Sequence, residues 1–109
     1  MKLVTNKKLL GQNPEMWLRT AGYNFIPERE DGQASYARRL GRDFYPRFHI
    51  YFIEQTASNG DVVVTFMLHL DQKRPGYEGF ARHNAEYDGD LVEREIERLK
   101  SLLLPDFLI

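Results

Sequence analysis

Two stretches of this chain, RFHIYFIE at residues 47–54 and DVVVTFMLHL at residues 61–70, decide its fold. In each stretch every second residue is a strong apolar residue, which is the pattern of a β-strand with one buried face. On the first strand the buried set would contain Phe48, Ile50 and Phe52. On the second strand it would contain Phe66 and Leu68. The two stretches therefore predict an antiparallel hairpin whose apolar sets share one face.

The connection between the two strands sets their register. A two-residue turn at Asn59-Gly60 is a strong hairpin signal, but it would put the apolar residues of one strand on the face of the polar residues of the other. A three-residue loop, Ser58 to Gly60, makes the two apolar sets coincide, and glycine at its last position tolerates the left-handed conformation that such loops use. In this register His49 lies opposite His69. Asp71 then lies opposite Arg47.

Other elements are expected before the hairpin. Asn13 is a good helix cap, and Pro14 suits the first turn of the helix that follows. Gly22 is expected to end this helix. Residues 23–28 are expected to be extended, and residues 35–40 to form a strand, whereas the first ten residues show no clear pattern.

The last helix has the strongest signals. Asp90 is predicted to cap it, with Glu93 at the spacing of a capping box, and Pro105 to stop it. Its apolar stripe is expected to cover the apolar face of the hairpin, and its members fall at helical spacing: Val92, Ile96, Leu99 and Leu103.

These elements predict one α+β domain over residues 1–109. We expect an antiparallel sheet of three to four strands with helices packed on one face, in the order αβββα. The strand before the hairpin is free to pair with either edge of it. An apolar tail, Phe107 to Ile109, is expected to pack back on the domain or to contact a second subunit.

Composition limits the class of protein. Apolar residues make up 42% of the chain and its mean hydropathy is -0.53, which fits a globular protein rather than a membrane protein. No apolar run approaches the roughly 20 residues of a membrane helix, and the N-terminus lacks the apolar core of a signal peptide. The absence of cysteine excludes disulfides, thiolate metal sites and cysteine catalysis. We therefore expect a cytoplasmic protein.

Charge is distributed unevenly although the net charge is only -1. Residues 1–50 hold nine Lys or Arg against five Asp or Glu, and residues 51–109 hold six against eleven. The first part is thus positive and the second negative. We interpret this as two solvated faces that attract each other within the fold or across a homodimer.

The expected αβββα order resembles that of double-stranded RNA-binding domains. This resemblance implies a nucleic-acid-binding domain, and it covers topology only. Those domains place a lysine cluster at the start of the last helix to bind phosphates, whereas this chain has Asp88, Asp90 and Glu93 there, which would repel them. No functional residue is transferred on this basis.

The strongest candidate site consists of His49, His69 and Asp71. Imidazoles at opposed strand positions have Cβ atoms about 5 Å apart, close enough to share a divalent metal such as zinc, with Asp71 as a third ligand and His83 as a further candidate. A metal with an open position can activate water for hydrolysis. Without a metal, the two histidines can act as base and acid.

A second candidate follows the hairpin. Residues 71–83 interleave basic and aromatic side chains, a composition that can bind single-stranded nucleic acid or a phosphorylated ligand. The candidates in it are Lys73, Arg74, Tyr77 and Arg82.

Three functional classes remain open from the sequence. The first is a small binding or interaction domain, homodimeric in one version. The second is a metal-dependent or histidine-based hydrolase with its site at His49, His69 and Asp71. The third is a nucleic-acid-binding domain, and the sequence does not decide whether the protein is an enzyme.

Overall fold

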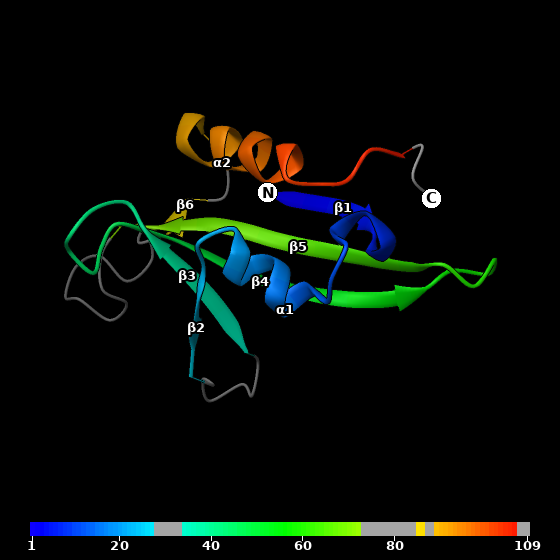
Figure 1. Cartoon of the computed structure of the whole chain (residues 1–109). Helices are drawn as coiled ribbons and strands as arrows, with labels where there is room; N and C mark the ends of the chain where they lie inside the picture. Colours follow the sequence, from blue (N-terminus) through cyan, green and yellow to red (C-terminus); the bar gives the residue numbers. More distant parts are fainter. Residues whose placement is uncertain (28–33, 73–84, 87–88, 107–109) are drawn as a thin grey trace.

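The computed structural model describes residues 1–27, 34–72, 85–86 and 89–106. Within this part the chain forms one antiparallel sheet in the order β1-β5-β4-β3-β2 (Figure 1). The short β6 also pairs directly with β5, at Leu70 and Asp71. The small α+β class is confirmed. In chain order the elements are β1 (Lys2–Asn6), the 3-10 helix η1 (Lys7–Leu10), α1 (Pro14–Thr20), β2 (Asn24–Ile26), β3 (Ser35–Arg39), β4 (Arg47–Thr56), β5 (Val62–Asp71), β6 (Ala85–Glu86) and α2 (Asp90–Ser101).

The predicted hairpin register is confirmed. His49 pairs with His69 and Arg47 with Asp71. The amide of Ala57 donates to the carbonyl of Asp61 at 2.7 Å, and the amide of Gly60 donates back to the carbonyl of Ala57 at 2.9 Å. Gly60 has a φ of 91°, the left-handed conformation that the three-residue loop requires.

The expected αβββα order and the three to four strands are corrected. The described residues contain β1 before any helix and β6 between β5 and α2, whereas β2 lies within residues 23–28, which were expected to be extended. Both additional strands are short, so their alternation is too brief to recognise, and pairing with β5 determines them. Residues Lys2–Asn6 pair with β5, while β3 pairs with β4, which answers the question of which edge β3 occupies.

The cap of α2 also differs from the prediction. Gly89 takes the N-cap position with a φ of 109°, so Asp90 is the first residue inside the helix and makes no capping hydrogen bond. Its carboxylate still lies at the positive end of the helix dipole. The predicted start of α1 is confirmed, because the Asn13 side chain accepts from the amide of Met16 at 2.8 Å. The expected contact of residues 107–109 lies outside the described residues.

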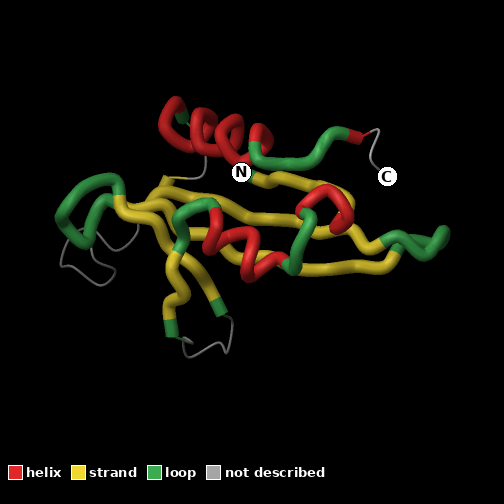
Figure 2. Tube along the Cα trace, viewed as in Figure 1, coloured by secondary structure: helices red, strands yellow, loops and turns green. Residues whose placement is uncertain are grey.

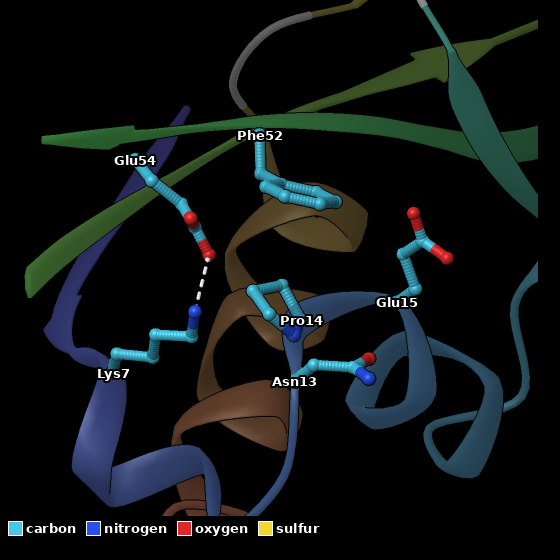
Figure 3. A pocket seen from close by; sticks show the side chains of 6 residues that line it. All are labelled: Lys7, Asn13, Pro14, Glu15, Phe52 and Glu54. Atoms are coloured by element: carbon cyan, nitrogen blue, oxygen red, sulfur yellow. Dashed lines mark ion pairs between the residues drawn. The ribbon is translucent and has the colours of Figure 1, made fainter.

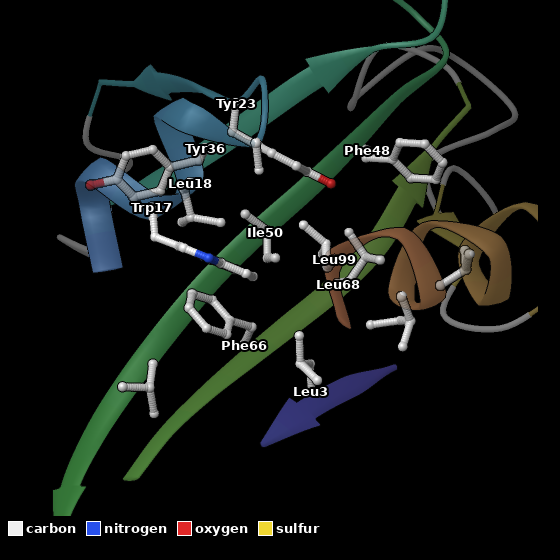
Figure 4. Close-up of a cluster of buried hydrophobic side chains, with 14 of the residues drawn as sticks. Leu3, Trp17, Leu18, Tyr23, Tyr36, Phe48, Ile50, Phe66, Leu68 and Leu99 are labelled. Carbon is white, nitrogen blue, oxygen red and sulfur yellow. The ribbon is translucent and has the colours of Figure 1, made fainter. Parts of the chain in front are cut away.

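Both helices cover one face of the sheet, as predicted (Figure 2). Trp17 of α1 packs on Phe66 of β5 with ring centroids 5.0 Å apart. From α2, Leu99 is fully buried in the same apolar cluster (Figure 4). No helix in the described part of the chain is long and apolar enough to cross a membrane.

A buried carboxylate fastens α2 to the rest of the domain. Glu95 is only 3% exposed and accepts from the hydroxyl of Tyr23 at 2.6 Å. Arg98 donates to both oxygens of Glu95 and to the carbonyl of Ala21, and Arg38 of β3 adds a second cation at 3.5 Å. Burial and the adjacent Glu95 raise the pKa of Tyr23, so the phenol keeps its proton and remains a donor.

We predict that Gly60→Ala lowers the free energy of unfolding by about 1–2 kcal/mol, because a side chain in the left-handed conformation is strained. The measurement is urea denaturation. Gly41→Ala is the matched control, since Gly41 has no positive φ and no atom lies within 4 Å of an added Cβ. Equal stability of the two variants would contradict the loop assignment.

Candidate metal and acid–base site

The candidate residues lie on the face of the sheet opposite the helices. Strand parity puts Phe48 and Ile50 into the core, so Arg47 and His49 point to the other side of β4. On β5, His69 and Asp71 occupy the positions directly opposite. Two adjacent cross-strand pairs therefore bring four polar side chains together near the end of the sheet where β6 joins β5.

The three predicted ligand residues converge closely. His49 Nδ1 lies 2.8 Å from His69 Nε2, with ring centroids 4.5 Å apart and planes at 73°. His69 Nε2 lies 3.0 Å from Asp71 Oδ1, and His49 Nδ1 lies 3.5 Å from Asp71 Oδ2. The sequence prediction that these residues form one cluster is thus matched by the geometry.

The cluster is largely shielded from solvent. The side chain of His49 is 3% exposed and that of Asp71 6%, whereas that of His69 is 12% exposed. A buried carboxylate requires a compensating charge. Arg47 supplies one, with its Nε donating to Asp71 Oδ2 at 3.3 Å. His69 is therefore the most accessible of the three predicted ligands.

The short contact between the two imidazoles is a hydrogen bond. Two ring nitrogens 2.8 Å apart need one proton between them, because two lone pairs or two N–H groups would repel each other. Which of the two nitrogens donates depends on the tautomer of each ring. His69 Nε2 also lies within hydrogen-bond distance of Asp71 Oδ1. Two imidazole nitrogens and the carboxylate of Asp71 therefore meet in one small space.

Asp71 is held in its charged form. Burial by itself would raise its pKa, but the hydrogen bond from His69 and the charges of His49, His69 and Arg47 together lower the pKa below its usual value. A deprotonated carboxylate beside two imidazoles is a donor set that binds divalent metals. Within the described residues, His49, His69 and Asp71 form a group whose ligand atoms all lie within 4.8 Å of one another.

The other sequence candidates lie outside the described residues. This applies to His83 as a metal ligand and to Lys73, Arg74, Tyr77 and Arg82 as ligand-binding residues, so their roles stay predictions.

Sequence analysis missed two aromatic residues that contact Arg47 and the pairing of Arg47 with Arg39. The guanidinium of Arg47 lies 5.1 Å from the ring centroid of Phe44 and 4.7 Å from that of Tyr45. Arg39 lies directly opposite Arg47 and also stacks on Phe44, at 4.5 Å. The sequence signal for these contacts was the aromatic pair Phe44 and Tyr45 just before β4. It could not be interpreted from the sequence, because the contact with Arg39 depends on the pairing of β3 with β4, which the sequence left open.

A separate groove lies on the helix-covered side, between η1, the start of α1 and the distal half of β4 (Figure 3). Two of its charged residues, Lys7 and Glu54, form an ion pair at 3.2 Å, and both are partly exposed. This groove does not touch the histidine cluster.

Comparison with known proteins finds no matching family model, no matching curated protein and no matching solved structure.

We predict that Asp71→Asn lowers the free energy of unfolding at neutral pH by about 2–3 kcal/mol, because Arg47 keeps a buried charge without its counter-ion. The pKa of Asp71 is lower in the folded protein than in the unfolded chain. The carboxylate of Asp71 therefore stabilises the fold fully above the unfolded pKa of about 3.9, and this stabilisation is lost as the pH falls through the folded pKa. Urea denaturation from neutral to acid pH should show the wild-type advantage shrinking only in the acid range.

Glu97→Gln is the control for this measurement, because Glu97 forms an exposed ion pair with Lys100. Its effect should stay below about 1 kcal/mol. An Asp71→Asn effect that is equally small, or that does not change with pH, would show that the buried charge network is not formed.

Proposed function

We propose that this domain binds a divalent transition metal ion through His49 Nδ1, His69 Nε2 and a carboxylate oxygen of Asp71. One observation carries the proposal: two imidazole nitrogens and a carboxylate oxygen on paired strands converge, with all three ligand atoms within 4.8 Å of one another. A divalent cation held between them would interact favourably with all three atoms. Arg47, bound to the second carboxylate oxygen, is the kind of outer hydrogen bond that orients a metal ligand.

The spacing of the donors bears on the choice of metal. Ligands about 2.1 Å from a metal are about 3.0 Å apart at neighbouring octahedral positions, and about 3.3 Å apart around tetrahedral zinc. The distances of 2.8 Å and 3.0 Å at His69 Nε2 are closer to the octahedral value, and the 3.5 Å between His49 Nδ1 and Asp71 Oδ2 is closer to the tetrahedral value. Two histidines and one carboxylate form both iron(II) sites and catalytic zinc sites, so we keep both metals as candidates.

Hydrolysis is the chemistry that follows from such a site. Three protein ligands leave coordination positions open, and water bound to a divalent metal ionises near neutral pH and becomes a nucleophile. The partly exposed edge of His69 supports access from solvent on this side of the cluster. We therefore favour a metal-dependent hydrolase among the enzyme classes.

A metal-free acid–base site is the second candidate, supported by the 2.8 Å contact between the imidazoles. His69 could pass its proton to a substrate while His49 and Asp71 stabilise the charge that results. Burial argues against this candidate, because the nitrogen atoms that would transfer the proton face each other inside the cluster. In the metal-bound form the same atoms bind the ion and need no contact with substrate.

The remaining functional interpretations stay predictions. These are the binding or interaction domain, the homodimer, the cytoplasmic location and the binding of nucleic acid. The topological support for nucleic-acid binding is weaker, because β1 and β6 extend the αβββα order on which the resemblance depends.

We expect metal-free protein to take up one divalent ion per chain, measured by calorimetry with zinc, manganese, cobalt and, without oxygen, iron(II). His69→Asn and Asp71→Asn should each weaken binding by at least about 100-fold. Tyr51→Phe, on the same face of β4, is the matched control and should bind as wild type. The affinity for the metal should decrease as the pH is lowered, because protons compete for the imidazoles. Failure of wild-type protein to bind any of these ions would refute the metal site.

We expect metal-loaded protein to hydrolyse an activated ester such as 4-nitrophenyl phosphate, and a chelator to abolish this activity. Steady-state kinetics before and after metal removal provide the measurement. Activity that survives the chelator but is lost in His49→Ala would favour the acid–base candidate instead.

A further inference from the structure

Two arginines lie side by side at the edge of the histidine cluster. Arg39 of β3 and Arg47 of β4 are direct cross-strand partners, and like charges at such positions repel each other. Asp71 balances the charge of Arg47. For Arg39 the structure shows no carboxylate partner in the described part of the chain, so within that part the two guanidinium groups have one carboxylate partner between them, that of Asp71.

An aromatic side chain fixes both guanidinium groups. Arg39 and Arg47 lie 4.5 Å and 5.1 Å from the ring centroid of Phe44, and Phe44 is itself 54% exposed. Stacking uses the flat face of a guanidinium and leaves the N–H groups at its edge available. Arg39 is solvent-exposed and has no hydrogen bond to another described residue. It therefore presents oriented donors to solvent beside the cluster.

A divalent ion would add positive charge beside the two arginines. It adds two positive charges to those of Arg39 and Arg47, and Asp71 is the one carboxylate that the described residues pair with these arginines. A ligand that carries two negative charges and several acceptor oxygens would compensate these positive charges. A phosphoryl group has both properties, and planar arginine donors match its oxygens in pairs.

We infer that Arg39, with Arg47 and the stacked Phe44, binds the phosphoryl group of the substrate of the neighbouring metal site. This inference rests on the proposed function and narrows the substrate to a phosphate ester. Hydrolysis would form a bond from the water oxygen to phosphorus and break the ester P–O bond. The released alcohol would take up a proton that the water gives up, and inorganic phosphate would remain.

A purely structural role for Arg39 makes a different prediction. If the stacking only held the connection between β3 and β4, removal of the charge would change stability and leave anion binding unaltered. Arg42 lies in the same connection, is also exposed and makes no ion pair, hydrogen bond or ring contact with the described residues. It is therefore a matched control for the general effect of positive charge.

The test uses inorganic phosphate as the probe, titrated by calorimetry into metal-loaded and metal-free protein. We expect binding to wild type, at least a tenfold weaker affinity in Arg39→Gln, and wild-type affinity in Arg42→Gln. Metal affinity should be no weaker in either variant than in wild type. Circular dichroism should show that Arg39→Gln remains folded, as expected for an exposed side chain.

Two results would overturn the inference: no phosphate binding by wild-type protein, or an equal loss in Arg39→Gln and Arg42→Gln. Failure of the metal site would look different. If the protein binds no metal but still binds phosphate, and Arg39→Gln weakens this binding, the proposed metal site is refuted and the anion site at Arg39 is supported.

Discussion

The register of the β4–β5 hairpin is the constraint on which the rest of the structure depends. A shift of one residue would exchange the two faces of one strand, placing His69 and Asp71 in the core and Phe66 and Leu68 in solvent. The observed register instead gives both helices a continuous apolar surface and aligns two polar cross-strand pairs behind it. Fold and candidate site are thus set by the same pairing.

Two buried carboxylates show how similar components can serve different purposes. Glu95 accepts hydrogen bonds from Tyr23 and Arg98, whose protons stay in place at neutral pH. Its network holds α2 on the domain, and its hydrogen bonds keep the same partners at neutral pH. Asp71 contacts two imidazoles, whose ring nitrogens are ligands for divalent metals, as well as Arg47. Its cluster therefore has the donor atoms that the proposed metal site requires.

The two faces of the sheet also have different roles. The apolar face carries the packing that stabilises the domain, through contacts such as Trp17 on Phe66. The opposite face carries the polar cluster and, beside it, the arginines stacked on Phe44. Because the cluster residues belong to paired central strands, their spacing is fixed by backbone hydrogen bonds rather than by flexible loops.

The sequence by itself determined the hairpin, its three-residue loop, the start of α1 and the meeting of His49, His69 and Asp71. These features follow from local alternation, turn chemistry and burial, which a single chain segment carries within itself. The cap of α2, at Gly89 rather than Asp90, is a local feature that the sequence signals missed by one residue. Only the tertiary structure decided that residues 2–6 form a strand and that β3 pairs with β4. Those features depend on which distant segments meet, and so does the pairing of Arg39 with Arg47, because an edge strand or a cross-strand neighbour is defined by its partner rather than by its own residues.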